Sequence, residues 1–254
     1  MVKIAVFDSG LGSLSIIKSI QKICKSEIIY FADQKNFPYG KKSKRQLEQI
    51  IKKTIKFLEE KFLPDLIVIA SNTPTLMINI TNKKIIGVNP PIKEAMILSK
   101  TKNIAILGTR SAITSKSLSN YIKNFYFSKD EKVFKINVSA LVELVESNKF
   151  MKNKIYCKKI IKNVLDDNFS NKKIDVATLS STHLSFLKSL LNFEFPQIQF
   201  IDPADNVAQN VLKKIKKNES KRNTLKIFTS GNVRHFEKKL YKIGIRNKVN
   251  FLSI

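Results

Sequence analysis

Short runs of apolar, often β-branched residues alternate along this chain with longer stretches of helical periodicity. Such alternation is typical of βαβ units, in which parallel strands form a sheet that helices cover. The runs that predict strands are residues 3–7, 28–31, 66–70, 85–87, 104–107, 135–138, 176–179, 199–201 and 226–229. The stretches that predict amphipathic helices are residues 14–23, 46–62, 115–124, 156–165 and 204–217. The sequence therefore predicts an α/β fold built on parallel sheets.

Two segments of the first half of the chain are echoed in the second. Residues 4–10 (IAVFDSG) resemble 104–110 (IAILGTR), and residues 65–73 (DLIVIASNT) resemble 175–183 (DVATLSSTH). Either match alone is what any two parallel strands show. Two matches in the same order, at offsets of 100 and 110 residues, instead indicate that the chain contains two similar α/β halves.

The repeat also predicts how the chain divides into domains. We expect a first domain of residues 1–90 and 203–254 and a second of residues 91–202, since 254 residues are enough for two α/β units. In open parallel sheets a ligand binds beyond the carboxyl ends of the strands. We therefore expect pseudo-two-fold symmetry between the halves and an active-site cleft between them.

The composition is that of a globular protein, with 43% hydrophobic and 26% charged residues. No apolar run approaches the ~20 residues of a membrane-spanning helix, so we expect no membrane segment. The N-terminus lacks the basic start and long apolar run of a signal peptide, and Cys24 and Cys157 lie far apart in the sequence. We therefore expect a cytoplasmic protein with free thiols.

The formal net charge is +26, from 46 basic and 20 acidic residues. A charge of this size attracts nucleic acid, and nonspecific, salt-sensitive binding is one interpretation. However, only five of the basic residues are arginines, the type that recognises phosphates and base edges by paired hydrogen bonds. The lysines are scattered in twos and threes, which favours a solvated basic surface, and both interpretations stay open.

Polar residues follow several of the predicted strands. They are Asp8, Ser9, Asn72, Thr73, Thr182 and His183. Such groups fix small polar ligands by directional hydrogen bonds, although an aspartate also forms turns and the others also cap helices. The turn after the first strand lacks the third glycine of a dinucleotide-binding motif, and Asp8 would repel a pyrophosphate. We therefore expect no nicotinamide cofactor.

Six short motifs, in order along the chain, carry a resemblance to a known family. They are FDSG at 7–10, PYGK at 38–41, ASNT at 70–73, LGT at 107–109, LVE at 144–146 and STH at 181–183. Together these motifs resemble glutamate racemase, of the aspartate/glutamate racemase superfamily. The likeness runs through nearly the whole chain and includes ID at 201–202 and FTSG at 228–231.

The resemblance implies an enzyme without cofactor or metal that interconverts L- and D-glutamate and supplies the D-isomer for peptidoglycan. It also implies which residues contact glutamate, the expected small-molecule partner. These residues are Asp8, Ser9, Tyr39, Gly40, Asn72, Thr73, Thr182 and His183. A homodimer is compatible with these predictions.

The family pattern places one cysteine in each of two turns, so that one thiolate removes the α-proton and the opposite thiol returns one. In this chain Ser71 and Ser181 stand at those positions. A serine hydroxyl is a much weaker acid than a thiol and needs another group to take its proton. We expect Asp8 and His183 to orient or weakly replace the proton-transfer groups, with Glu146 holding His183. Catalytic activity is therefore expected to be weak or lost.

Three alternatives remain open at this stage. The chain could be a catalytically inactive homologue that still binds an amino acid, or a lysine-rich protein associated with nucleic acid. It could also use Ser71 or Ser181 as a nucleophile activated by His183, as a hydrolase or lyase does, but no Gly-x-Ser-x-Gly turn supports this chemistry.

Overall fold

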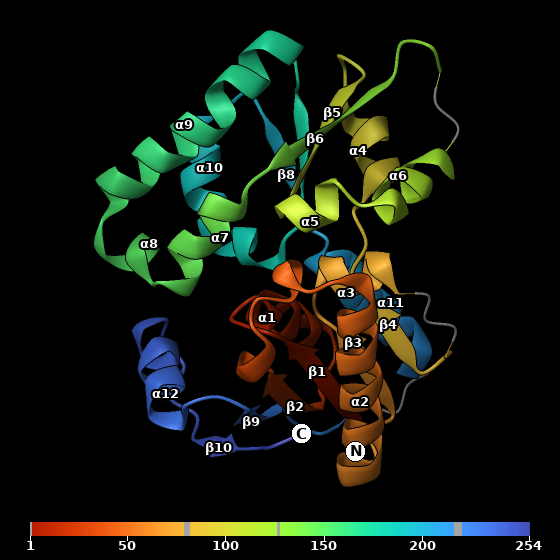
Figure 1. Cartoon of the computed structure of the whole chain (residues 1–254), viewed down its shortest axis with the longest axis vertical. Helices are drawn as coiled ribbons and strands as arrows, with labels where there is room; N and C mark the ends of the chain where they lie inside the picture. Colours follow the sequence, from red (N-terminus) through yellow and green to blue (C-terminus); the bar gives the residue numbers. More distant parts are fainter. Residues whose placement is uncertain (1, 79–81, 126–127, 216–219) are drawn as a thin grey trace. The chain divides into compact units, whose positions relative to one another are not determined.

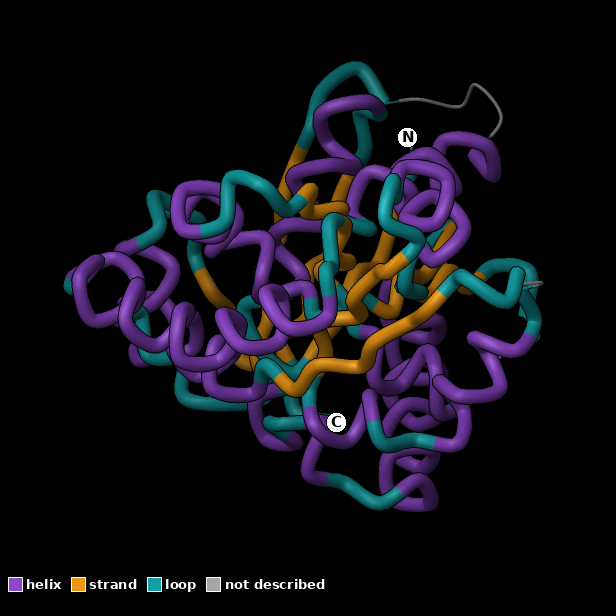
Figure 2. The backbone as a smooth tube through the Cα atoms, turned by 90° about the horizontal axis from the view of Figure 1, so that it is seen from above, coloured by secondary structure: helices purple, strands orange, loops and turns teal. Residues whose placement is uncertain are grey.

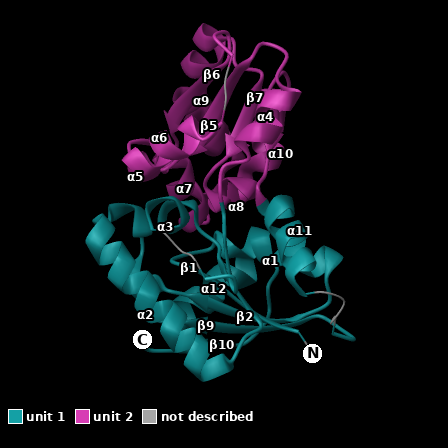
Figure 3. Cartoon of the chain, turned by 90° about the vertical axis from the view of Figure 1, so that its right-hand side faces the viewer, with its two compact units in different colours: residues 1–88, 204–254 teal, residues 89–203 magenta. Residues whose placement is uncertain are grey.

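The computed structural model of the chain describes residues 2–78, 82–125, 128–215 and 220–254. The chain divides into two compact units, which Figure 3 shows in different colours. Unit 1 comprises Met1–Val88 and Ala204–Ile254, and unit 2 comprises Asn89–Pro203. The last two residues of the helix expected at 204–217 lie outside the described residues.

The described strands of unit 1 form one parallel sheet in the order β10-β9-β2-β1-β3-β4 (Figure 1). The strands are β1 (Lys3–Asp8), β2 (Glu27–Ala32), β3 (Leu66–Ile69), β4 (Ile85–Gly87), β9 (Thr224–Thr229) and β10 (Val249–Phe251). The helices are α1 (Ser13–Ile23), α2 (Lys44–Phe62), α3 (Asn72–Met77), α11 (Ala204–Ile215) and α12 (Val233–Lys242). Two short 3₁₀ turns, η1 (Gln34–Asn36) and η2 (Tyr39–Lys41), follow β2.

Helices cover the sheet of unit 1 because its strands are apolar on both faces. Phe7, Phe31 and Ile69 pack in one buried core with Leu47 and Ile51 of α2. A capping box between the side chains and backbone of Ser43 and Gln46 fixes the start of α2. Helices α1 and α11 pack against each other, and in Figure 2 the strands are flanked by helices.

The described strands of unit 2 also form a parallel sheet, in the order β6-β5-β7-β8. The strands are β5 (Asn103–Gly108), β6 (Lys132–Asn137), β7 (Val176–Leu179) and β8 (Gln199–Ile201). The helices are α4 (Ile92–Leu98), α5 (Arg110–Ile113), α6 (Lys116–Lys123), α7 (Ser139–Glu146), α8 (Lys149–Lys152), α9 (Lys154–Lys172) and α10 (Lys188–Glu194), with a 3₁₀ segment η3 (Thr182–Leu187). The predicted α/β class with two parallel sheets is confirmed.

The sequence repeat corresponds to a repeat in strand pairing. The order β2-β1-β3-β4 in unit 1 matches β6-β5-β7-β8 in unit 2. Ile4 lies opposite Leu66 in the β1–β3 pair, and Ile104 lies opposite Val176 in the β5–β7 pair. These partners are related by the same offsets, 100 and 110 residues, that relate the echoed segments. The two echoes therefore mark the two central strands of each unit, paired in the same register.

Several elements differ from the sequence prediction. The helix expected at 156–165 runs over Lys154–Lys172, because the buried stripe of Cys157, Ile161, Leu165 and Phe169 continues to its last turns. The strand expected at 135–138 runs over Lys132–Asn137, and its first four residues are exposed or half-buried, so they lack the apolar run of a buried strand. The α-helices and the strand that were not predicted are α3, α4, α5, α7, α8, α10, α12 and β10.

No helix within the described ranges has both the length and the apolar character needed to cross a membrane. The longest of them, α2 and α9, are 19 residues each and carry many lysines.

Asp175 joins the segments that precede two strands of unit 2. Its carboxylate accepts hydrogen bonds from the Ser99 hydroxyl at 2.6 Å, from the Lys100 backbone N–H at 2.7 Å, and from the Thr101 backbone N–H and hydroxyl at 3.0 and 2.9 Å. Partial burial raises the pKa of Asp175, but these hydrogen bonds outweigh burial and leave the pKa below its usual value. The ionised carboxylate therefore stabilises the start of the sheet.

We expect Asp175→Asn to lower the free energy of unfolding at pH 7 by about 1 kcal/mol, after allowance for solvent screening of a half-exposed group. The sign follows from the lowered pKa. A carboxyl with a depressed folded-state pKa adds stability above its unfolded pKa and loses it as pH falls through the folded-state pKa. Urea unfolding between pH 2 and 7 measures this, and equal acid dependence in the two proteins would contradict it.

Candidate functional site

Each unit gathers polar side chains at the carboxyl edge of its sheet. In unit 1, β1 ends at Asp8 and β3 is followed by Ser71, and the two strands are parallel neighbours. In unit 2, β5 ends at Gly108 and β7 is followed by Ser180 and Ser181. Since parallel strands end at the same edge, the residues that follow the two strands of each pair are brought close together.

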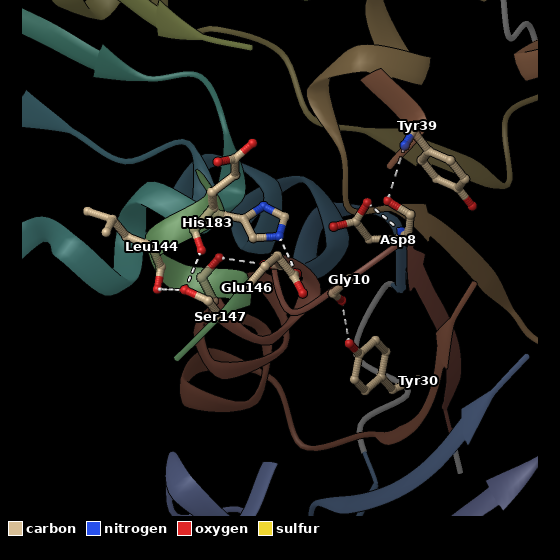
Figure 4. A network of polar contacts seen from close by, with 12 residues as sticks. Asp8, Gly10, Tyr30, Tyr39, Leu144, Glu146, Ser147 and His183 are labelled. Carbon is tan, nitrogen blue, oxygen red and sulfur yellow. Dashed lines mark hydrogen bonds and ion pairs between the residues drawn. The ribbon is translucent and has the colours of Figure 1, made fainter. Parts of the chain in front are cut away.

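In unit 1 a connected set of contacts joins the turn after β1 to the loop after β2. The Asp8 Oδ1 accepts the Ser9 backbone N–H at 2.6 Å, and the Ser9 Oγ accepts the Tyr39 backbone N–H at 3.5 Å (Figure 4). The Tyr30 hydroxyl donates to the Gly10 carbonyl at 2.7 Å. Asp8, Ser9 and Tyr39 are all buried, so their backbone and side-chain positions are tightly defined. Gly40 follows Tyr39 within η2 and is half-buried.

Tyr39 is held at both ends of its side chain. Its ring lies in the core beside α2, and its hydroxyl donates to Asp33 Oδ2 at 3.0 Å. Burial raises the pKa of Tyr39 well above its ordinary value, and the nearby Asp33 and Asp8 carboxylates raise it further. The phenol is therefore neutral and serves as a hydrogen-bond donor near neutral pH.

Asn72 is the first residue of α3, which packs against η2. Its side chain is 3% exposed, and within the described residues neither its amide nitrogen nor its oxygen has a hydrogen-bond partner. An amide buried without a partner costs about 1–3 kcal/mol. Thr73, the next residue, is buried as well. Asn72 is thus a side chain that a bound polar ligand would satisfy.

In unit 2 the expected contact between Glu146 and His183 is present. His183 Nε2 lies 2.7 Å from Glu146 Oε1, and both side chains are buried (Figure 4). Glu146 ends α7 and His183 lies in η3, and these two elements pack together. A carboxylate in this position fixes the orientation of the imidazole ring. Thr182, beside His183, is also buried, whereas His235 lies exposed on α12.

Ser71 and Ser181 occupy equivalent places in the two units. Each follows a buried strand with an extended backbone and precedes a helical segment, and neither hydroxyl caps that segment. Their side chains are therefore not committed to helix capping.

The two cysteines are free thiols, and both are buried. Cys24 ends α1, just before β2 begins, so it lies at the amino edge of the sheet rather than the edge that carries Asp8. Cys157 lies in α9, where burial raises the pKa of its thiol. A thiol with a raised pKa is a poor base at neutral pH. Among the residues that the structure describes, no group of three or more His, Cys, Asp and Glu side chains could hold a metal ion.

Comparison with known proteins identifies the family. A glutamate racemase from Buchnera aphidicola is 33% identical over 225 residues, which cover 84% of this chain and 87% of that protein. A glutamate racemase from Sulfurihydrogenibium is 30% identical over 242 residues, covering 92% and 91% of the two chains. This chain belongs to the glutamate racemase family. The family that its six motifs resemble is thereby confirmed, although no family model matches the sequence.

Solved structures share the glutamate racemase fold. Glutamate racemase RacE1 from Bacillus anthracis matches with a TM-score of 0.86 at 23% identity, covering 100% of this chain and 98% of that one. Glutamate racemase from Francisella tularensis, solved in complex with D-glutamate, matches with a TM-score of 0.82 at 21% identity, covering 99% and 97%. At these identities the comparison shows a common fold.

Sequence reasoning missed two residues that contact this group. Asp33 bonds the Tyr39 hydroxyl, and Ser230 bonds Asp33 at 3.0 Å. Ser230 lies within the FTSG motif at 228–231, and Asp33 lies two residues after the strand predicted at 28–31, so both positions carried a signal. The signal was incomplete because the pairing of β2 with β9 decides that these positions meet.

The raised pKa of Tyr39 predicts how stability depends on pH. In the unfolded chain tyrosine ionises near pH ~10, whereas the folded state favours the neutral phenol. The stability that this preference contributes is complete below pH ~10 and is lost as pH rises above it toward the folded-state pKa. We therefore expect the unfolding free energy of the wild type to fall more steeply above pH ~10 than that of Tyr39→Phe.

Denaturant unfolding of both proteins between pH 8 and 11 provides the measurement. The lysines titrate in the same range, but they are common to both proteins and cancel in the difference. Parallel curves above pH ~10 would show that Tyr39 ionises normally in the folded protein.

Proposed function

We propose that this glutamate racemase homologue binds glutamate and interconverts its enantiomers slowly or not at all. The residues proposed to contact the amino acid are Asp8, Ser9, Tyr39, Gly40, Asn72, Thr73, Thr182 and His183. The observation that carries binding is the buried side chain of Asn72, whose amide has no partner among the described residues. The relatives' name and the D-glutamate bound to the Francisella protein support the choice of amino acid.

The proposed loss of rate rests on the chemistry of Ser71 and Ser181. Removal of the weakly acidic α-proton needs a base near neutral pH, and an alcohol serves only when another group accepts its proton. The loss of a matched acid or base lowers a rate by about 10²–10⁴-fold per step. Asp8 and His183 are the remaining groups that could orient or exchange a proton, and Glu146 keeps His183 in place.

In this proposal any D-glutamate formed would serve peptidoglycan synthesis, and no cofactor takes part. The chemistry of each step is a proton transfer at the α-carbon, with Asp8 and His183 as donors or acceptors. A protein that has lost this chemistry would keep only the binding function, as an inactive amino-acid-binding homologue.

Exchange of the α-proton in D₂O tests binding and catalysis together. Wild type, Ser71→Ala/Ser181→Ala and Ser71→Cys/Ser181→Cys are incubated with L- or D-glutamate, and deuterium incorporation and optical inversion are followed separately. We expect the double-cysteine variant to invert glutamate at least about 10²-fold faster than wild type, because it restores a thiol on each turn. The double-alanine variant should exchange and invert glutamate at the wild-type rates, since the serines contribute little to proton transfer.

The outcomes separate the alternatives. Inversion by wild type as fast as by an active double-cysteine variant would overturn the proposed loss of activity. Exchange without inversion in wild type would indicate one working base. Calorimetric titration of both enantiomers, with Asn72→Ala as the variant, measures binding itself, and no heat of binding for wild type would overturn the proposal as a whole.

A second candidate function, binding of single-stranded nucleic acid, is favoured by one surface feature. In unit 1, α12 and residues 245–248 line a hollow of about 590 Å³. The basic residues that line this hollow are Lys238, Lys242, Arg246 and Lys248. Glu237 is the acidic residue of the lining, and its carboxylate accepts a hydrogen bond from the Val249 backbone N–H. The exposed ring of Tyr241 lies under the Arg246 guanidinium, 4.8 Å from ring centroid to Cζ. Cations beside an aromatic ring are typical of such sites.

Fluorescence anisotropy with a labelled single-stranded oligonucleotide measures this binding. Four phosphate contacts predict that log K falls against log salt concentration with a slope of about −3. Lys242→Glu/Arg246→Glu should weaken binding more than Lys116→Glu/Lys123→Glu, which changes the net charge equally on exposed positions of α6. Equal weakening by the two variants would show that net charge alone attracts the oligonucleotide.

A further inference from the structure

Asp33 is a buried carboxylate placed directly after β2, and its side chain is fully engaged. It is 2% exposed. Oδ2 accepts the Tyr39 hydroxyl at 3.0 Å and the Asn36 amide at 2.9 Å. Oδ1 accepts the Ser230 hydroxyl at 3.0 Å and the same Asn36 amide at 3.0 Å. Each oxygen therefore meets one hydroxyl and one amide, all of them donors.

The partners of Asp33 come from two distant parts of the chain. Asn36 and Tyr39 belong to the loop that follows Asp33 itself, whereas Ser230 is 197 residues further on. Ser230 Oγ also accepts the Lys35 backbone N–H at 3.0 Å, so the turn after β9 holds the loop after β2 at two points. A Cβ on Gly231 would lie 2.7 Å from the Gln34 Cβ, which shows how closely the turn and the loop approach.

This arrangement explains the FTSG motif at 228–231. Thr229 lies opposite Ala32 in the pairing of β2 with β9, and its hydroxyl donates to the Ala32 carbonyl at 3.1 Å. Ser230 then reaches Asp33, and Gly231 leaves room for Gln34. The motif therefore serves the loop that carries Tyr39 and Gly40, although it contains none of the residues proposed to contact glutamate.

We propose that Asp33 is a positioning residue for glutamate binding, which acts by fixing Tyr39 and Gly40 and is itself fixed by Ser230. This inference rests on the proposed function, since it assigns Asp33 a role in the same site. Two contacts fix the position of the Tyr39 side chain: its ring packs in the core, and its hydroxyl donates a hydrogen bond to Asp33. The Tyr39 backbone N–H in turn faces Ser9, beside Asp8, so a displaced loop would also disturb the turn after β1.

The carboxylate cannot be replaced by an amide without a mismatch. Asparagine has the shape of aspartate, but one of its two terminal atoms is an NH₂ group that only donates. Three groups donate four hydrogen bonds to Asp33, and the NH₂ of Asp33→Asn would replace one of the two accepting oxygens. This NH₂ would face the Asn36 NH₂, which also donates, and the hydroxyl beside it would have to turn and accept. The raised pKa of Tyr39 is consistent with this, since a nearby carboxylate disfavours the phenolate.

A double-mutant cycle in glutamate affinity tests the inference. Isothermal titration is carried out on wild type, Asp33→Asn, Tyr39→Phe and Asp33→Asn/Tyr39→Phe. We expect Asp33→Asn to weaken glutamate binding about tenfold in the wild-type background, as the loss of a buried hydrogen bond to a charged group does. In the Tyr39→Phe background the same change should have a much smaller effect, because Asp33 acts through Tyr39.

Asp175→Asn is the matched control. Asp175 also accepts four hydrogen bonds, but it precedes β7 and so lies at the amino edge of its sheet. The Asp175→Asn variant should be less stable than wild type and bind glutamate with the same affinity. Carbon-13 labelling of the tyrosine Cζ atoms adds a readout that needs no ligand: the Tyr39 resonance, assigned with Tyr39→Phe, should shift in Asp33→Asn and stay in place in Asp175→Asn.

The possible failures are distinguishable. If wild type binds glutamate and Asp33→Asn binds it equally well, or if the effects of Asp33→Asn and Tyr39→Phe add, the positioning role is overturned while the proposed function stands. If wild type does not bind glutamate, the proposed function and the role of Asp33 within it are both overturned. An unmoved Tyr39 resonance in Asp33→Asn would separately exclude the contact on which the inference depends.

Discussion

Parallel pairing of β1 with β3, and of β5 with β7, is the constraint on which the candidate site depends. Because both strands of each pair run in the same direction and end at the same edge, the turns that follow them meet. In unit 1 this edge receives Asp8 and Ser71, and in unit 2 it receives Gly108 and Ser181. The sheets are apolar and covered by helices, so the polar groups at their edges sit on a rigid support.

Polar groups at such an edge are buried, and other hydrogen bonds have to compensate for those that they lose to water. The carboxylates of Asp33 and Glu146 are compensated within the protein, by hydroxyl and amide donors and by His183 respectively. Asn72 is not compensated among the described residues. A buried amide without a hydrogen-bond partner lowers the stability of the fold, and a ligand that bonds to it can restore this stability. This is the physical argument for the proposed binding of glutamate.

In the proposed function, the presence of serine hydroxyls where the family pattern has thiols separates glutamate binding from catalysis. Glutamate binding depends on hydrogen bonds and charge, which Asp8, Tyr39 and His183 still provide in this proposal. Proton transfer at carbon depends on the acidity of the transferring group, which Ser71 and Ser181 do not match. In this proposal the same backbone turns still support glutamate binding after catalysis has weakened.

The sequence by itself determined the α/β class, the repeat and the family, because strand periodicity and short motifs are local features. It also identified which strand ends carry polar residues. The tertiary structure decided which residues reach one another: Ser230 meets Asp33 across 197 positions, a contact that the sequence did not predict. The contact of Glu146 with His183 was expected from the family resemblance, and the structure supplied its distance of 2.7 Å. The tertiary structure also revealed the full length of α9 and the existence of β10. Local patterns do not encode such contacts, because they arise only when strand pairing and helix packing bring distant segments together.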